Sequence, residues 1–388
     1  MPGPSIRLRV AAFIVLSVPA CDNGSSGGVH TVSSDAMHAY ELSLAVADGH
    51  AAVAWHGGPT DHNDIYLQWL DSGGGASSPP LRLTQGPDDA YEPDLQIIGT
   101  TLVVGWYEKN PHSGATRAWL ARTDAQGHEL WRRPLSAAGD PARNPVVRLG
   151  ANSIAVAWIE KDAVWAARYG LNGRLLSGPL GLGSANTDTW NLNAAVGPDG
   201  VFHVVYDAGA GAHNHQLRLA VLDHDPARNL ALSPDDIAEV YPDLRFNQAD
   251  IAALTWFEQR GKRDKVYFAV LPQRALDTGQ PLFWRQVTSV DTSSFGSYLA
   301  WNVDRLEIAW CDNRTGTTQV YARSFDSTGR ALGPERRLSH AGTTGSIPSV
   351  QPYGTGFLVA WNEYRSVPNP GHGHDRILSS VAVTARLP

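Results

Sequence analysis

The sequence contains little cysteine, no excess of basic residues and no long apolar run after its first twenty residues. Only Cys21 and Cys311 are present among 388 residues, and the net charge is −7. A nucleic-acid-binding protein normally needs a basic face, so the charge excludes nucleic acid as an expected partner. No window shows a 3.6-residue apolar period of helical length, which argues against a helical fold.

The first 21 residues have the layout of an export signal. Arg7 and Arg9 precede an apolar run from Val10 to Val18, and "VPAC" ends at Cys21. This run is too short to span a bilayer, which takes about 20 residues. We therefore expect residues 1–20 to be a signal peptide, and its loss would leave a net charge of −9.

A cysteine directly after a small residue resembles the lipobox of bacterial lipoproteins. The resemblance implies lipidation at Cys21, with residues 21–28, "CDNGSSGG", as a flexible tether. It implies a bacterial cell-envelope location, with the chain lipid-anchored and facing the periplasm or the cell exterior. Pro19 departs from the usual pattern, so plain secretion is the alternative. If Cys21 carries lipid, Cys311 has no partner within the chain and the fold contains no disulfide.

Short strand-like runs that end in an aromatic residue recur along the rest of the chain. These anchors lie 51, 52, 48, 50, 54 and 51 residues apart, and they are Trp55, Trp106, Trp158, Tyr206, Trp256, Trp310 and Trp361. Each period contains four β-rich runs separated by Gly, Asn or Asp turns. Four-stranded units at this spacing predict an all-β fold, a seven-bladed β-propeller of antiparallel blades, as one domain over residues 29–388.

The two ends of this domain predict how the ring closes. The last period stops at Pro388 without a fourth strand, whereas "VHTVS" at 29–33 precedes the first complete period. We expect this N-terminal strand to complete the last blade by pairing with residues 376–384, which would cover an exposed sheet edge.

The repeat resembles blades of bacterial propeller proteins that read roughly "VaWxDxR…iYaqrfDxxGxxlG…rlS". Residues 308–339 match it best. The resemblance implies a sialidase-like or generic seven-bladed propeller with no defined activity. The sialidase Asp-box, S-x-D-x-G-x-T-W, is absent, because "TDAQGHELW" and "FDSTGRALG" have two residues between Asp and Gly.

Charged residues recur just after the anchors. Two positions after the anchor the chain carries Glu108, Glu160, Glu258, Asp312 and Glu363, and four positions after it three units carry Arg260, Arg314 and Arg365. We expect them on one face, around a mouth of the channel. Glu258, Asp312, Glu363 and the three arginines are candidate catalytic residues, while Glu108 and Glu160 are candidates for ligand binding. The alternative is architectural, with each carboxylate pairing locally to set its hairpin.

Histidine-bearing loops occur where this pattern breaks. His56 and His62 lie in "HGGPTDHND", His213 and His215 in "DAGAGAHNHQ", and His372 and His374 in "NEYRSVPNPGHGHD". Neutral imidazole beside Asp suits zinc or a similar divalent metal. The alternative is that these are ordinary solvent-facing loops with no cofactor.

Aromatic residues stand before the first strand of several units, at Tyr40, Tyr91, Trp190, Tyr241 and Phe295. They can form stacking platforms for sugar rings or pack between neighbouring blades. Cys311 occupies a position that differs in every unit, which argues for a tolerated small residue rather than a nucleophile.

Three functions fit these features. The first, which we favour, is a non-catalytic binding or scaffold protein for a glycan or an envelope protein. The second is a glycan-active enzyme, either a glycoside hydrolase with two carboxylates such as Glu258 and Asp312 or a polysaccharide lyase with His372 and the arginines. The third is a metal-binding accessory protein. We expect a monomer that contacts the membrane only through its lipid anchor.

Overall fold

The computed structural model describes most of the chain after the leader. The described residues are 28–183, 188–209, 215–222, 227–233, 238–260, 263–271, 276, 284–368, 376–384 and 387. The predicted signal peptide, Cys21, His213, His372 and His374 lie outside them, as does the side chain of Arg260.

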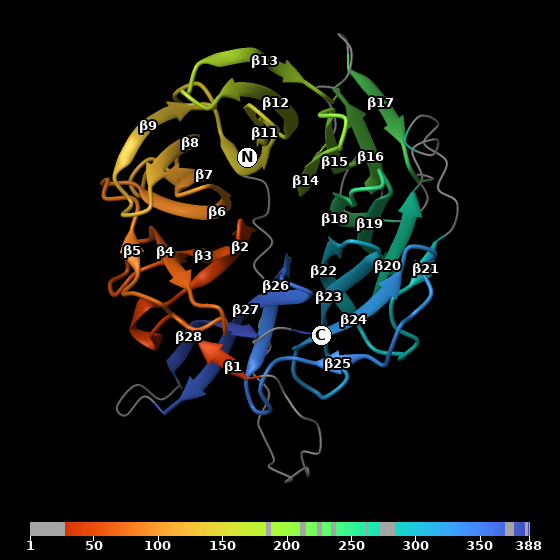
Figure 1. Cartoon of the computed structure of the whole chain (residues 1–388). Coiled ribbons are helices and arrows are strands. Elements are labelled where there is room, and N and C mark those ends of the chain that lie inside the picture. The colour runs from red at the N-terminus through yellow and green to blue at the C-terminus, as the bar shows by residue number, and fades with distance from the viewer. Residues whose placement is uncertain are drawn as a thin grey trace.

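Seven four-stranded antiparallel sheets form a closed ring of blades, so the predicted seven-bladed β-propeller is confirmed (Figure 1). In each of the first six blades the chain runs from the inner to the outer strand. The strands of blades 1 to 3 are β2 (Tyr40–Ala47), β3 (His50–Gly57), β4 (Asp64–Leu70), β5 (Leu81–Arg82); β6 (Asp89–Ile98), β7 (Thr101–Lys109), β8 (Thr116–Asp124), β9 (Glu129–Pro134); β10 (Ala142–Leu149), β11 (Ser153–Glu160), β12 (Ala163–Gly170) and β13 (Leu175–Gly181).

The remaining blades repeat this order, and a 3-10 helix, η1 (Asp35–Met37), precedes blade 1. The strands of blades 4 to 7 are β14 (Leu192–Val196), β15 (Phe202–Gly209), β16 (His215–Val221), β17 (Arg228–Ala231); β18 (Ala238–Phe246), β19 (Ala252–Arg260), β20 (Arg263–Leu271), β21 (Arg285–Gln286); β22 (Ser294–Asn302), β23 (Arg305–Asp312), β24 (Gln319–Asp326), β25 (Arg336–Arg337); β26 (Thr344–Tyr353), β27 (Gly356–Val367), β28 (Arg376–Thr384) and β1 (Val29–Thr31).

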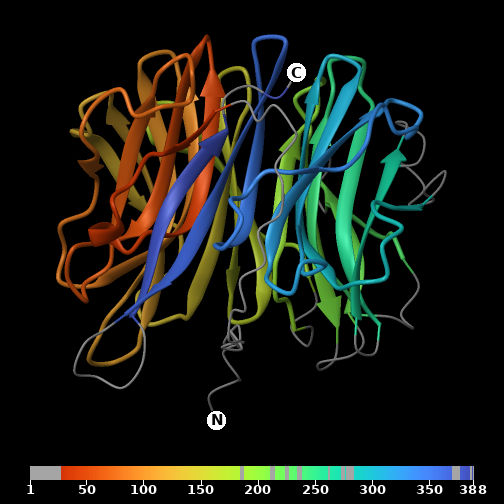
Figure 2. The same cartoon turned by 90° about the horizontal axis from the view of Figure 1, so that it is seen from below.

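The N-terminal strand closes the ring as predicted. β1 is the fourth strand of blade 7 and pairs antiparallel with β28, with Val29 opposite Thr384. The pairing continues beyond β1, since the amide of Val32 donates to the carbonyl of Val381 at 2.8 Å. Seen from the side, the strands of every blade run between the two faces of the ring (Figure 2). Hydrogen bonds between the two ends of the chain therefore hold blade 7 together.

The aromatic anchors lie in the core. Five of them, Trp55, Trp158, Trp256, Trp310 and Trp361, are among the most deeply buried side chains of the described residues. Each anchor stands on the second strand of its blade and packs against a neighbouring blade, as Trp106 does with Ile65 and Leu67 of blade 1. The aromatic anchor therefore recurs once per blade because each interface between neighbouring blades needs a large buried apolar side chain. Replacing one such Trp by Ala would lower the free energy of unfolding by about 3–5 kcal/mol.

Side-chain bridges join the inner strands of neighbouring blades around the channel. The Ser43 hydroxyl accepts a hydrogen bond from the amide of Leu95 at 3.0 Å, and Asp94 Oδ2 accepts one from the amide of Val147 at 2.6 Å. Asp243 Oδ2 does the same for Leu299 at 2.9 Å. These contacts fix the spacing of the strands that surround the axis. Among the described residues, no helix is long and apolar enough to span a membrane.

Candidate functional site at one mouth of the channel

Inner strands begin with a β-bulge in six of the seven blades. Each of these strands has one extra residue relative to its partner. In each bulge one residue has a left-handed backbone, and these residues are Glu41, Glu92, Asn144, Tyr241, Gly296 and Ile347. Bulges redirect side chains and are common beside functional sites. We call the end of the channel where these bulges lie the bulge mouth.

Two bulge residues, Glu41 on β2 and Glu92 on β6, place carboxyl groups in this mouth. Burial raises the pKa of Glu41 to about 7, although its side chain is 42% exposed. Burial and the negative charge of Glu41 raise the pKa of Glu92 to about 8, against a smaller opposing effect of Arg143. Partial exposure together with strong desolvation is what we expect for a group on the wall of a narrow channel.

The negative charge of Glu41 affects the pKa of tyrosines on several blades. It contributes to raising the pKa of tyrosines from blades 2, 5, 6 and 7, after the larger effect of burial on each; these are Tyr107, Tyr241, Tyr298 and Tyr364. A side chain on blade 1 can be close to all of these only if it extends toward the axis. Glu41 therefore extends toward the channel axis, and its charge also acts on Glu92.

His56 contacts both of these residues. Its Nδ1 is 3.6 Å from Glu41 Oε2 and accepts a hydrogen bond from the amide of Glu92 at 3.5 Å. Burial lowers the pKa of His56 to about 3, so the imidazole is neutral and its proton is on Nε2. His56 thus contacts the side chain of Glu41 and the backbone of Glu92, and it gives neither residue a positive charge.

A continuous arc of aromatic rings follows one side of the bulge mouth. The ring centroids of Tyr40 and Tyr364 are 6.1 Å apart, and those of Tyr40 and His56 are 5.9 Å apart. His56 lies 5.1 Å from Tyr91, which stacks on Tyr107 at 5.4 Å. The tyrosines of this arc are partly exposed. Tyr40 and Tyr91 thus pack against neighbouring rings and still present surface to solvent.

Other aromatic residues predicted as platforms complete the mouth. Tyr241 stacks on Phe257 at 5.4 Å, and Phe257 lies 6.5 Å from Phe295. Trp190 contacts His215, with the ring centroids 3.9 Å apart. These rings come from blades 4, 5 and 6, opposite the arc.

Below Trp190, a buried pair links two of the predicted site regions. His215 Nδ1 lies 3.2 Å from Asp207 Oδ1, and both side chains are fully buried. Asp207 also accepts hydrogen bonds from the amides of Trp190 and Tyr241, at 2.7 and 3.3 Å. Asp207 thus holds blades 4 and 5 together and orients the aromatic residues of the mouth.

The carboxylates two residues after the anchors contact their own blades. The indole N–H of Trp106 donates to Glu108 at 3.2 Å, and Glu108 also binds Arg132 of the outer strand β9 at 2.6 Å. The same indole contact occurs from Trp158 to Glu160 at 2.9 Å and from Trp361 to Glu363 at 3.2 Å. These three carboxylates therefore lie over the blades on the second strands, farther from the axis than Glu41 and Glu92.

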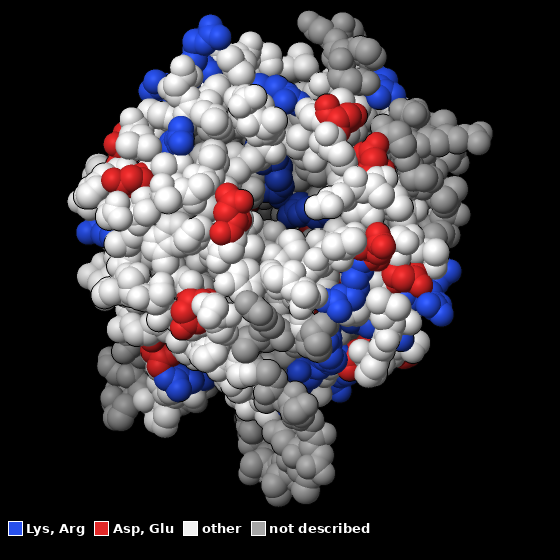
Figure 3. Space-filling model, viewed as in Figure 1, with Lys and Arg blue, Asp and Glu red and all other residues white. Residues whose placement is uncertain are grey.

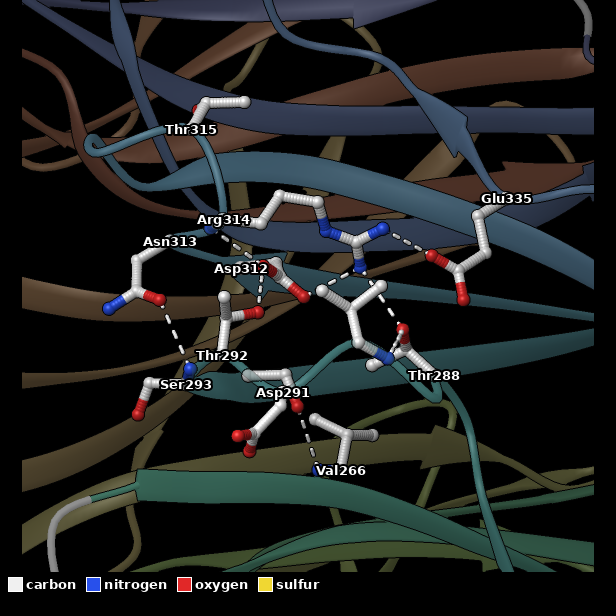
Figure 4. Close-up of polar contacts among 12 residues, drawn as sticks. Val266, Thr288, Asp291, Thr292, Ser293, Asp312, Asn313, Arg314, Thr315 and Glu335 are labelled. Atoms are coloured by element: carbon white, nitrogen blue, oxygen red, sulfur yellow. Dashed lines mark hydrogen bonds and ion pairs between the residues drawn. The ribbon is translucent and has the colours of Figure 1, made fainter.

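The Asp312–Arg314 pair sets a loop of blade 6 (Figure 4). Asp312 is fully buried and accepts hydrogen bonds from Thr292 and from the amide of Arg314, both at 2.9 Å. The Arg314 guanidinium binds Asp312 at 2.7 Å and also pairs with Glu335. Burial opposes ionisation of Asp312, but these hydrogen bonds keep its pKa below the usual range. The carboxylate of Asp312 and both terminal nitrogens of Arg314 are therefore engaged within the blade.

The other catalytic candidates are scattered rather than grouped. Glu258 is buried on β19, beside Lys265 in the ladder. Glu363 binds His340 at 3.0 Å, and Arg365 pairs with Asp35 of η1. The contacts of Glu363 and Arg365 are to adjacent segments, and those of Asp312 stay within blade 6 and the loop before it.

The histidines predicted as metal ligands do not meet within the described residues. His62 lies between Asp89, at 3.1 Å, and Asp64, at 3.7 Å, while His56 and His215 belong to separate clusters. In this part of the chain, no group of three or more His, Cys, Asp or Glu side chains is placed to hold a metal ion. His213, His372 and His374 lie outside it.

Cys311 is buried behind Phe295, and burial raises the pKa of its thiol to about 12. A thiol with such a pKa is not a nucleophile at neutral pH.

A second polar cluster lies farther along the channel, on the inner strands of blades 2 to 5. Asn193 Oδ1 accepts hydrogen bonds from Arg148 at 2.5 Å and Arg245 at 3.1 Å. Arg148 pairs with Asp94 at 2.8 Å, and Arg245 pairs with Asp243 at 2.6 Å. Figure 3 shows Lys or Arg atoms inside the hollow at the centre of the molecule. These charges balance within the cluster.

Comparisons with known proteins agree with the fold. No protein-family model and no curated protein matches the sequence. A protein of unknown function from Dyadobacter fermentans is similar over 93% of this chain and 99% of its own, with a TM-score of 0.55 and 13% identity. The phage phi92 endosialidase is similar over 94% of this chain and 70% of its own, with a TM-score of 0.52 and 11% identity.

The β-propeller domain of the Trilobed protease from Pyrococcus furiosus is also similar, over 88% of this chain and 94% of that domain, with a TM-score of 0.51 and 7% identity. At these identities the similarity shows the fold alone.

Proposed function

We propose that the protein binds a carbohydrate at the bulge mouth, without needing a metal. The observation that carries this proposal is the pair of carboxyl groups, Glu41 and Glu92, inside a ring of partly exposed aromatic side chains. Ligand sites typically combine apolar or aromatic walls with a few convergent polar groups. Sugar rings suit such a site, because their C–H faces pack on aromatic rings while their hydroxyl groups bind carboxyl oxygens.

A second candidate function is glycoside hydrolysis. A hydrolase needs one protonated carboxyl group to donate a proton to the leaving group and a second, ionised one to act as nucleophile or base. Glu92, with the higher pKa of about 8, has the character of the acid, and Glu41, with a pKa of about 7, ionises first as the pH rises and would serve as the carboxylate. This candidate replaces Glu258 and Asp312 as the catalytic pair.

The predicted leader and Cys21 extend this proposal to location. We propose that the propeller is held at the bacterial envelope by lipid on Cys21, where its ligand is a glycan of the envelope or of the surroundings.

A glycan array and a polysaccharide-degradation screen test both functions. The matched variants are the isosteric double substitution Glu41→Gln/Glu92→Gln and, as control, Glu129→Gln on the exposed outer strand β9. Binding that the double variant loses and the control keeps supports the binding function, and degradation lost in Glu92→Gln supports the hydrolase. A wild-type protein that binds and degrades no glycan contradicts both.

A further inference from the structure

The bulge mouth carries more acidic than basic groups close to Glu92. Glu41 and Glu92 are close enough for their charges to interact, and Arg143 is the positive group that acts on Glu92. Arg143 is itself engaged, because its guanidinium binds the carbonyl of Thr189 at 2.9 Å and lies 3.5 Å from Asp162. The positive charge of Arg143 therefore offsets only part of the negative charge that Glu41 and Glu92 carry when they are ionised.

Glu92 also has an unused acceptor. Its Oε2 atom is buried and has no hydrogen-bond partner among the described residues. Leaving a buried carboxyl oxygen without a hydrogen-bond partner is energetically unfavourable. A positively charged ligand group placed beside this oxygen would compensate for the missing partner, whether or not it has an N–H to donate.

We propose that the group bound in the bulge mouth is an ammonium cation, carried by an amine-bearing sugar or by a quaternary ammonium headgroup. The cation would lie between Glu41 and Glu92, against the tyrosine rings. This inference names the ligand chemistry of the proposed carbohydrate site and rests on that site.

The aromatic arc supports a cation over a neutral group. Cations are attracted to the faces of aromatic rings, and cages of aromatic rings recognise quaternary ammonium groups. The arc of Tyr364, Tyr40, His56, Tyr91 and Tyr107 runs beside both carboxyl groups without a break longer than 6.1 Å between centroids. Tyr241 and Tyr298, which sense the charge of Glu41, face it from blades 5 and 6.

Without a bound cation, Glu41 and Glu92 are largely protonated at neutral pH. With pKa values near 7 and 8, Glu41 and Glu92 together hold more than one proton at pH 7. A cation stabilises their ionised forms, so its binding releases protons, whereas a neutral ligand has no such effect. The titratable and charged groups that face the pair are His56, Tyr40, Tyr91, Tyr107, Arg143, Tyr241, Tyr298 and Tyr364.

Choline and its neutral isostere 3,3-dimethylbutan-1-ol test the inference directly, because they differ in charge and hardly in shape. Calorimetric titration of the purified full chain at pH 7, in two buffers with different ionisation enthalpies, gives both affinity and proton release. We expect choline to bind about tenfold more tightly than the isostere and to release about one proton. Equal affinities, or no proton release, would overturn the inference.

Two variants test whether the preference for choline arises at the bulge mouth. Glu41→Gln/Glu92→Gln is expected to lose the preference for choline, and Glu129→Gln is expected to keep it. Thermal unfolding checks that each variant is folded. If the double variant does not fold, the affinity ratio and proton release of the wild-type protein still decide the question.

Sugar oligomers distinguish an amino sugar from a quaternary headgroup as the source of the cation. They also distinguish a failure of this inference from a failure of the proposed function. Glucosamine oligomers are compared with N-acetylglucosamine oligomers at pH 6, where the free amine is charged. Preference for the glucosamine oligomers supports an amino sugar. Choline binding without binding of either oligomer supports a quaternary headgroup and contradicts the carbohydrate function. If both oligomers bind equally and choline does not bind, the proposed carbohydrate function stands and the proposal of a cationic ligand is overturned.

Discussion

The imidazole Nδ1 of His56 lies 3.6 Å from Oε2 of Glu41, yet the two groups do not form an ion pair at neutral pH. Burial lowers the pKa of His56 to about 3 and raises that of Glu41 to about 7. Between these values both groups are predominantly neutral. The bulge mouth is therefore a desolvated place with proton-bearing carboxyl groups, and its behaviour depends on pH.

Glu92 makes folding stability depend on pH in a predictable direction. Its folded pKa of about 8 is above the ordinary value of 4.5, so the folded protein holds a proton that the unfolded chain releases. Its contribution to stability is complete below about pH 4.5 and is lost as the pH rises through 8. Relative to wild type, Glu92→Gln is thus expected to become progressively more stable from pH 5 to pH 8.5.

Urea unfolding of the two proteins at several pH values measures this difference, in which the titration of groups that Glu92 does not influence cancels. A difference that stays constant from pH 5 to pH 8.5 would show that Glu92 ionises normally.

Asp312 is expected to be architectural. Its replacement by alanine leaves Arg314 beside Glu335 alone and removes the acceptor of Thr292, so we expect a loss of about 3 kcal/mol in the free energy of unfolding. Asp291, whose side chain is 80% exposed, is the control, and Asp291→Asn is expected to cost less than about 1 kcal/mol. Chemical denaturation compares the two, and equal small effects would contradict this role.

Asn193 is expected to hold the arginines of the channel. Replacing it with leucine removes the oxygen that binds Arg148 and Arg245, and should cost about 2–3 kcal/mol. Asn193→Asp keeps an acceptor for both guanidinium groups and is expected to be much less destabilising. The order of their melting temperatures is the readout, and a leucine variant as stable as the aspartate variant would show that the bridge is unimportant.

Ring closure by the N-terminal strand predicts the effect of a truncation. A chain that begins at Asp35 lacks β1 and Val32, and it leaves β28 as an open edge. We expect a lower unfolding midpoint and self-association through that edge. Denaturation and analytical ultracentrifugation measure the two effects. Ser33→Ala, which removes only the acceptor for the Val381 amide, should cost about 1 kcal/mol and stay monomeric.

The blade repeat could be predicted from the sequence because the same physical requirement recurs seven times. Each blade needs a large buried side chain at its seam, and Trp55, Trp158 and Trp361 record that need in the sequence. The closing strand could be predicted because the last period lacks a fourth strand-like run and residues 29–33 supply an extra one. These inferences use periodicity, which does not depend on where any single side chain points.

The bulge mouth could not be predicted in the same way. One extra residue in a strand reverses which later side chains face the channel, so the direction of Glu41 and Glu92 depends on a bulge that periodicity does not reveal. The available signal was weak: Glu92, Asn144, Tyr241 and Ile347 each precede a proline at the start of an inner strand. Conversely, Glu108 was visible as a repeat, but its partner Arg132 on β9 could not be paired with it from sequence.

The most direct test of the account is the titration of Glu41 and Glu92 in the folded protein. Carboxyl 13C NMR of glutamate-labelled protein, with signals assigned from Glu41→Gln and Glu92→Gln, follows each group from pH 4 to pH 9. We predict two coupled steps near pH 7 and pH 8, and the loss of Glu92 should move the remaining Glu41 step to lower pH. Two independent titrations near pH 4.5 would contradict a shared site at the bulge mouth.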